Sequence, residues 1–100
     1  MPEVSRKGDE LSTGHICATT TTLDTPGQGT VFAEGILVAR KGDSTVSHPF
    51  PPAPPCVPHT ANVNAGSGTV FVVGLECARK GDSADAGNMT QGASTVFAGG

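Results

Sequence analysis

The sequence predicts a small all-β protein made of short strands and frequent turns, and three observations support this fold class. β-branched and aromatic residues occur in short runs such as TVF, which favour a half-buried strand. The chain contains fourteen glycines and eight prolines, so turns are frequent. No window combines the apolar stripe of a helix with capping residues at its ends.

A repeated segment organises the chain. QGTVFAEGILVARKGDSTVSH begins at residue 28, and SGTVFVVGLECARKGDSADAG aligns with it without a gap at an offset of 39 residues. Shorter copies lie at the two ends of the chain, SRKGDELSTGH at 5–15 and STVFAGG at 94–100. Joining the end to the beginning completes a third copy. We therefore predict a cyclically closed set of three β repeats with pseudo-threefold symmetry, unlike a solenoid with atypical end repeats.

Each copy is predicted to form a strand, a tight turn and a returning strand. TVF supplies the first strand, and ILVA at 36–39 and LECA at 75–78 supply the returning strand in two copies. A glycine after TVF permits the tight turn; these glycines are Gly35, Gly74 and Gly99. The RKGD segment that follows predicts a second turn, in which Gly accepts a positive φ and Asp bonds the local backbone.

Composition limits the possible functions. Residues 1–100 form one domain of ordinary size, but the chain is only 36% apolar, with four Phe and no Trp or Tyr. We therefore expect a modest core of marginal stability. A net charge of −3 without a basic patch argues against nucleic acid as a partner.

The expected location follows from the chain start and the cysteines. No apolar run follows a basic head, so we expect no signal peptide. The longest apolar stretch, at 69–78, is too short to cross a bilayer and contains Glu76, so no stable membrane insertion is expected. Three cysteines are too few and too uneven for a disulfide scaffold, which indicates a reducing cytosol.

Three histidines and one cysteine are candidate metal ligands. His15 follows the first RKGD turn and His48 follows the second, so repeat symmetry brings them near one axis, whereas the third copy leads to Asn88. Cys56 and His59 form a C-x-x-H pair, a spacing that allows one turn to supply two ligands. The predicted site is His15, His48, Cys56 and His59.

The segment SHPFPPAPPCVPH at 47–59 holds six of the eight prolines and would position these ligands. A straight polyproline segment from His48 to Cys56 would span about 25 Å. Ligands of one zinc ion lie only about 3–4 Å apart, so the segment must bend back on itself. One of its X-Pro bonds is a candidate for the cis form.

The proposed donor set indicates a structural zinc ion. Four protein ligands leave no open position for water or substrate, so a zinc hydrolase, the enzymatic alternative, lacks both a vacancy and a general base. Cobalt or iron would accept a similar set. Cys17 is the reserve ligand, and Cys77, which aligns with a strand valine, is expected to be a small buried hydrophobe. Asp82 and Asp85 are interpreted as solvated loop residues.

These motifs together resemble the PAAR-repeat family. The resemblance rests on ARKGDS at 39–44 and 78–83, RKGD at 6–9, the three TVF runs, the two histidines after the turns and the C-x-x-H pair. It covers essentially the entire chain. This sequence differs from the family in two ways: members more often read PAARxGD, and their proline insert is shorter. These differences affect the expected geometry of the loop more than the expected fold.

The resemblance implies a fold, a partner and a role. The fold would be a small cone of short strands, with zinc near the apex and a broad base on the blunt end of a trimeric β-helical spike of the VgrG type. One chain would cap one trimer as a non-enzymatic tip of a type VI secretion system, loaded in the cytoplasm and exported with the spike. The alternatives are a contractile phage tail tip and an adaptor module that docks effectors. Some members carry toxin domains, and we expect no extension domain here.

Overall fold

Ten short strands make up the regular structure in the computed structural model, which describes residues 1–51 and 56–100. They are β1 (Glu10–Ser12), β2 (Thr20–Thr22), β3 (Phe32–Ala33), β4 (Ile36–Leu37), β5 (His48–Phe50), β6 (Val57–His59), β7 (Phe71–Val72), β8 (Leu75–Glu76), β9 (Ser83–Ala84) and β10 (Gly87–Met89). No helix occurs in the described residues, so the all-β prediction is confirmed. Within that part of the chain, nothing forms a helix that is long and apolar enough to cross a membrane.

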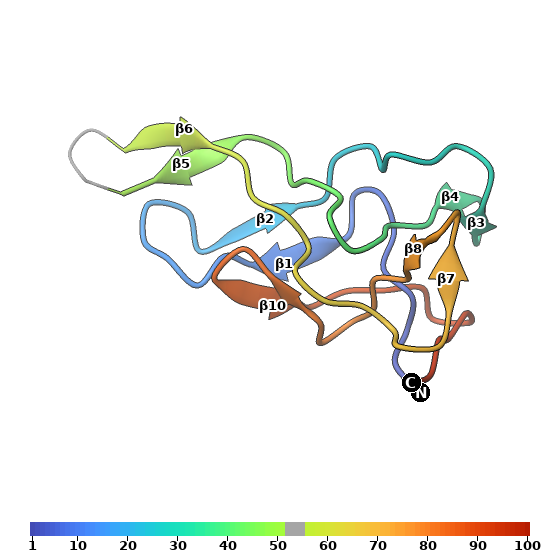
Figure 1. Cartoon of the computed structure of the whole chain (residues 1–100). Coiled ribbons are helices and arrows are strands. Elements are labelled where there is room, and N and C mark those ends of the chain that lie inside the picture. Colours follow the sequence, from blue (N-terminus) through green and yellow to red (C-terminus); the bar gives the residue numbers. More distant parts are fainter. Residues whose placement is uncertain (52–55) are drawn as a thin grey trace.

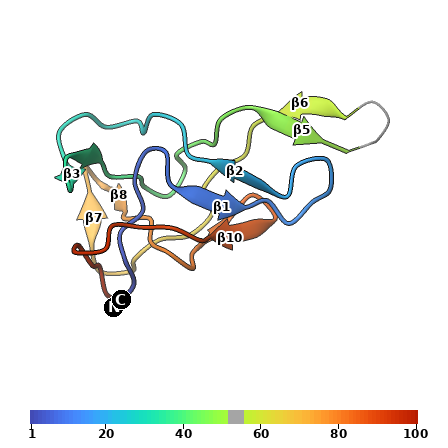
Figure 2. The ribbon, with the colours of Figure 1, turned by 180° about the vertical axis from the view of Figure 1, so that it is seen from behind.

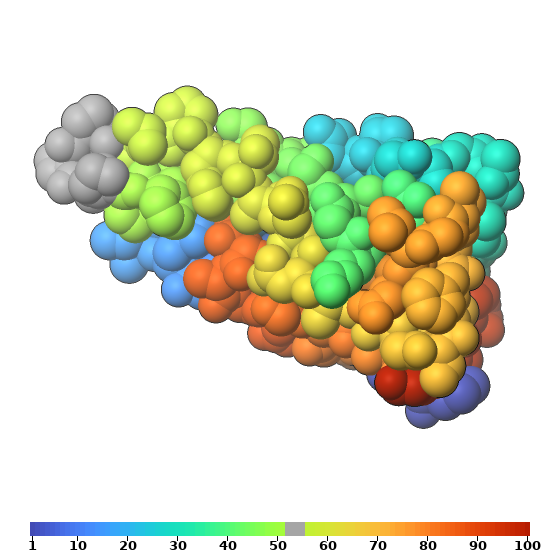
Figure 3. All heavy atoms as spheres, viewed as in Figure 1, coloured from blue at the N-terminus to red at the C-terminus, as the bar shows by residue number. Residues whose placement is uncertain are grey.

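The strands form one four-stranded antiparallel sheet, in the order β2-β1-β10-β9, and three separate two-stranded hairpins, β3-β4, β5-β6 and β7-β8. Figure 1 shows β3-β4 and β7-β8 at the broad end of the molecule, near both termini, while β5-β6 projects at the opposite end. The molecule is elongated, with principal extents of 41 × 23 × 21 Å. In the space-filling view it tapers from the broad end toward the proline-rich hairpin (Figure 3).

The two complete repeats form matching hairpins at the broad end. Phe32 pairs with Leu37 in one, and Phe71 pairs with Glu76 in the other. Each hairpin turns through two residues of positive φ, Glu34-Gly35 at 54° and 79°, and Val73-Gly74 at 48° and 84°. This is the conformation of a two-residue type I′ turn, whose twist matches that of the strands. The predicted strand, turn and returning strand are confirmed for these two copies, whereas Gly99, the glycine predicted for the third turn, has no positive φ.

The three RKGD segments form the second predicted turn. Their glycines have φ values of +83°, +94° and +94°, a region that side chains other than glycine rarely adopt. The Asp carboxylate of each turn accepts a hydrogen bond from the Arg backbone three residues earlier, at 2.7–2.9 Å. It also pairs with the guanidinium of the same Arg. The predicted role of these segments as turns is therefore confirmed.

A ring of backbone hydrogen bonds joins the three copies just before these turns. Ser5 N–H donates to Ala78, Ala78 N–H donates to Ala39, and Ala39 N–H donates back to Ser5, at 2.9–3.0 Å. Each copy therefore contacts both of the others at an equivalent position. Pseudo-threefold symmetry of the whole fold stays a prediction.

The two chain ends complete the third copy, as the repeat pattern predicted. Glu3 and Phe97 form an antiparallel bridge, and Val4 N–H donates to Val96 at 2.9 Å. Figure 2 shows the two termini next to each other. The C-terminal TVF run therefore pairs with the N-terminal segment, where the other copies pair with their own returning strand.

Two small groups of apolar side chains form the core. The first lies under the hairpins of the broad end and contains mainly Val and Ala with Cys77, which is 1% exposed. Cys77 is thus the buried small hydrophobe that its alignment predicted. The second group lies beside the RKGD turns; it contains Leu11, Leu23, Ala39, Val63, Ala78, Ala84 and Met89. No aromatic side chain belongs to either group, which agrees with the expected modest core.

Candidate metal centre

Three histidines converge where the molecule narrows toward the β5-β6 hairpin. His48 begins β5 and His59 ends β6, and the two are directly paired across the hairpin, so their side chains lie on the same face. His15 comes from the loop between β1 and β2. The predicted bend of the proline-rich segment is confirmed by this pairing. Residues 52–55 of this segment lie outside the described residues, and so do the X-Pro bonds among them that were candidates for the cis form.

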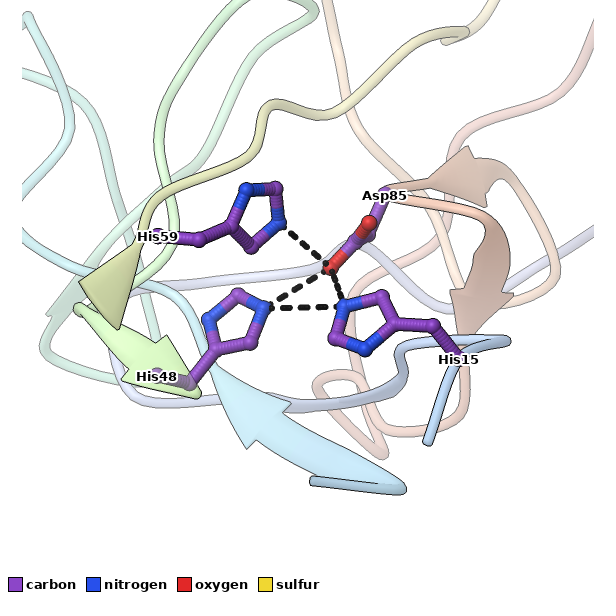
Figure 4. Close-up of side chains that lie close together, drawn as sticks. All are labelled: His15, His48, His59 and Asp85. Atoms are coloured by element: carbon purple, nitrogen blue, oxygen red, sulfur yellow. Dashed lines mark hydrogen bonds and ion pairs between the residues drawn. The ribbon is translucent and has the colours of Figure 1, made fainter. Parts of the chain in front are cut away.

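Asp85 is the fourth member of the cluster, as Figure 4 shows. One of its carboxylate oxygens, Oδ2, lies 2.9 Å from Nε2 of His15, 2.9 Å from Nε2 of His48 and 3.4 Å from Nε2 of His59. Its side chain is only 6% exposed. The interpretation of Asp85 as a solvated loop residue is therefore wrong.

The third repeat positions Asp85 through its own turn. Asp85 follows β9, has a positive φ of 54°, and its backbone N–H donates to Asn62 at 3.0 Å. The Asn64 side chain donates to the carbonyl of Asp85 at 2.9 Å. Two copies thus contribute a histidine after RKGD and the third contributes a carboxylate. Comparison of the repeats pointed to Asn88 in the third copy, but β9 ends at Ala84 and the turn that follows it brings Asp85 to the site instead.

Backbone carbonyls orient two of the imidazole rings. Nδ1 of His15 lies 2.9 Å from the Ile16 carbonyl, and Nδ1 of His48 lies 2.9 Å from the Val46 carbonyl. Because a carbonyl can only accept, each Nδ1 carries the proton that it donates. The Nε2 lone pairs of neutral rings then face the centre of the cluster, which is the arrangement of metal-binding histidines.

The donor set fits a small tetrahedral cation. Two Nε2 atoms lie 3.3 Å apart and both face a carboxylate oxygen, so the cluster places acceptors against acceptors. A positive charge at the centre removes that repulsion. Ligands of a tetrahedral zinc, with bonds of about 2.0–2.1 Å, lie about 3.3 Å apart. The four ligand atoms here all lie within 4.8 Å of one another, so this His₃Asp group could hold a metal ion.

Contacts within the cluster shift the pKa values of Asp85 and His15. Burial disfavours the charged form of Asp85, but hydrogen bonds from His15, His48 and His59 outweigh it and lower the pKa of the carboxyl. Burial likewise opposes the charge of His15, yet its bonds to the Ile16 carbonyl and to Asp85 raise the pKa of its ring. Both shifts have the sign expected when a carboxylate accepts hydrogen bonds from imidazole N–H groups in the absence of a metal ion. A metal ion at the centre would take the place of those Nε2 protons, because a histidine ligand binds through its deprotonated nitrogen.

Phe50 packs against the cluster. Its ring stacks on His59 at a centroid distance of 4.2 Å and meets the His15 ring edge-on at 4.8 Å. Phe50 lies two residues after His48 on the same strand, so both side chains face the same way. No sequence motif pointed to Phe50. It restricts the rings of two histidines and covers them with an apolar surface.

The structure brings three of the four predicted ligands together and separates the fourth. Cys56 is bonded to Cys17 in a disulfide, with the Cα atoms 6.2 Å apart, a normal separation for such a bridge. A sulfur in a disulfide carries no thiolate for a metal ion. The expectation that Cys56 is a ligand is therefore wrong for this structure, and so is the role of Cys17 as its reserve. Asp85 occupies the fourth place.

The fold and the cluster define a class: a small tapered β protein with a possible metal site at its narrow end. A family model for the PAAR motif matches residues 13–88, a range that contains all four cluster residues. Comparison with curated proteins gives no match. The chain belongs to the PAAR motif family, whose members are spike-tip proteins, and the resemblance seen in the sequence is confirmed.

Proposed function

We propose that this protein is the structural tip of a type VI secretion spike, where one chain caps one VgrG-type trimer and a single zinc ion holds its narrow end together. The observation that supports this role most directly is that exposed apolar residues and the His₃Asp cluster lie toward opposite ends of the molecule. Exposed apolar residues belong to the β3-β4 and β7-β8 hairpins of the broad end. The His₃Asp cluster includes His48 and His59 of the β5-β6 hairpin, which lies at the opposite end (Figure 1).

The apolar surface carries one aromatic side chain from each repeat. Phe32, Phe71 and Phe97 occupy the same place in the three TVF runs and are 56%, 59% and 46% exposed. Large exposed apolar patches are typical of interaction sites. Around them lie further exposed apolar residues: Met1, Val31, Ile36, Val70, Val73 and Leu75. Three equivalent contacts suit a partner with three identical subunits.

Capping would serve both partners. A β-helical trimer ends in unpaired strand edges, which otherwise recruit other chains. The tip covers those edges and in turn buries its own phenylalanines. The tapered outline then continues the spike to a narrow end (Figure 3).

The metal ion would act as a structural element. His15, His48, His59 and Asp85 fill all four positions of a tetrahedral ion, and catalytic zinc sites keep one position free. We therefore propose a non-enzymatic role. Nitrogen and oxygen donors also suit iron or cobalt, so elemental analysis of the purified protein identifies the ion. The protein would be loaded in the cytoplasm and leave with the spike, with effectors as possible passengers.

Native mass spectrometry of the tip mixed with a VgrG-type trimer tests the proposal. We expect one chain per trimer. Phe71→Asp should weaken binding at least tenfold, because it places a charge within the apolar contact. Ile16→Asp is the matched control, since Ile16 is 66% exposed but lies in the loop beside His15, and it should bind like the wild type. Several chains per trimer, or no complex, would contradict the proposal.

A further inference from the structure

The disulfide links the two segments that carry opposite sides of the metal cluster. We propose that Cys17 and Cys56 form a redox clamp, a disulfide that closes in an oxidising compartment and slows the loss of the metal ion. The clamp rests on the proposed metal site and adds a regulation to it. While the two thiols are reduced, the ion exchanges more readily.

The positions of the two cysteines support the clamp. Cys17 lies two residues after His15 in the β1-β2 loop, and Cys56 lies three residues before His59, next to the start of β6. A bond between them therefore ties the loop that supplies one ligand to the hairpin that supplies two.

Little else in the backbone joins this loop to the hairpin. Among the described residues, β5 and β6 pair only with each other and form a sheet separate from β1 and β2. The chain just before β5 is joined to the end of β2, where Val46 N–H donates to Thr22 at 3.0 Å, but this bond lies outside the β1-β2 loop. The hairpin meets the loop through side chains, namely the histidine rings, Asp85 between them, and Phe50 against His15. Losing the metal requires the loop and the hairpin to separate, and the disulfide opposes that separation.

A small oxidising reagent can reach the two cysteines of the clamp. Cys17 and Cys56 are both partly exposed, so a low-molecular-weight disulfide can reach them. Each thiol gives up its hydrogen, one sulfur–sulfur bond forms within the protein, and one disulfide reagent is reduced to two thiols. Cys77 does not compete, because it is 1% exposed and burial raises the pKa of its thiol to about 11.

Binding linkage fixes the sign of the effect. If the disulfide and the ion order the same loop, each must favour the other by the same factor. If Cys56 were instead a zinc ligand in the reduced protein, zinc would bind its thiolate and favour the reduced state. The two models therefore predict opposite responses of the thiol–disulfide equilibrium to zinc.

The first experiment measures zinc release to a coloured chelator in excess. Oxidised wild-type protein should release zinc at least tenfold more slowly than protein reduced with a phosphine, which does not itself bind zinc as a thiol reagent would. The Cys17→Ser, Cys56→Ser double variant should release zinc at the fast rate under both conditions. Cys77→Ala should behave like the wild type, because Cys77 is remote from the clamp.

The second experiment uses only wild-type protein and so avoids any folding defect of the variants. The fraction of disulfide is measured in glutathione buffers of graded ratio, with zinc and after its removal. We expect zinc to raise the equilibrium constant for disulfide formation. The factor should equal the ratio of the zinc affinities of the oxidised and the reduced protein. A shift toward the reduced form, or no shift, would overturn the clamp.

The outcomes separate the clamp from the metal site itself. Zinc bound at one ion per chain but released equally fast in both redox states refutes the clamp and leaves the site standing. Absence of bound zinc in both states refutes the metal site, and the clamp with it.

Discussion

At the scale of single residues, the cluster depends on what surrounds each ligand. Asp85 is nearly buried and one of its oxygens faces the Nε2 atoms of three imidazole rings, and Phe50 restricts two of these rings. The backbone carbonyls of Ile16 and Val46 orient His15 and His48. A cation at the centre would replace the repulsion between these acceptors with attraction.

Replacing Asp85 with Asn tests the carboxylate. The change preserves size and removes the negative charge, so zinc affinity should fall by at least about 10–100-fold, the loss typical for groups that merely support a ligand. Titration calorimetry gives the affinity. Asp24→Asn, in an exposed loop, is the matched control and should bind zinc like the wild type. Unchanged affinity in Asp85→Asn would show that the carboxylate is not a ligand.

At the scale of elements, the turns specify the fold. The two hairpins of the broad end turn through residues of positive φ, and each RKGD turn combines a positive-φ glycine with an Arg–Asp pair. In each RKGD turn the Asp side chain accepts a hydrogen bond from the backbone N–H of the Arg, so the side chain stabilises the backbone of the turn. The same arrangement recurs in three copies, because each copy must reverse direction at the same distance from the hydrogen-bond ring.

Substitution of Gly42 by Ala tests this requirement. Gly42 has a φ of +94° and no atom within 4 Å of where a Cβ would lie, so strain of the backbone is the only cost. We expect a loss of about 1–2 kcal/mol in the free energy of unfolding. For a domain of this size that lowers Tm by roughly 5–15 °C.

A thermal melt followed by circular dichroism measures the effect. Gly29→Ala is the matched control, since Gly29 is equally open but has no positive φ. It should melt within a few degrees of the wild type. Equal melting temperatures for the two variants would contradict the assigned role of the RKGD glycine.

At the scale of the whole molecule, a sparse core is supplemented by cross-links. The core contains no aromatic side chain, and the hydrogen-bond ring and the paired termini close the three copies on each other. At the narrow end, the disulfide closes a loop with a sequence separation of 39 residues. Chain-entropy arguments give such a link about 4 kcal/mol of stabilisation.

Removing the proposed metal ion should lower the stability of the protein. Structural zinc binds zinc-finger peptides with about 10–16 kcal/mol, while an entire domain has only about 5–15 kcal/mol of stability. Dialysis against a chelator should therefore lower Tm by well over 10 °C, and added zinc should restore it in proportion to the logarithm of its concentration. A melting temperature that does not respond to the chelator would contradict a structural ion.

Patterns in the sequence were sufficient to predict the strands, the turns, the closure of the chain ends and the approach of three histidines. Each of these depends on neighbouring residues or on a repeat that relates distant ones, so local periodicity and turn chemistry are sufficient. His15 and His48 lie 33 residues apart, and their equivalent places after RKGD predicted that they would meet.

The fourth residue of the cluster and the state of the cysteines became known only from the folded chain. Asp85 reaches His15 across 70 residues because it lies in the turn between β9 and β10, and repeat alignment cannot reveal where that turn falls. Cys17 and Cys56 bond because the β1-β2 loop packs beside the proline-rich hairpin. Both outcomes depend on which loops share the narrow end, and that is a property of chain packing in space.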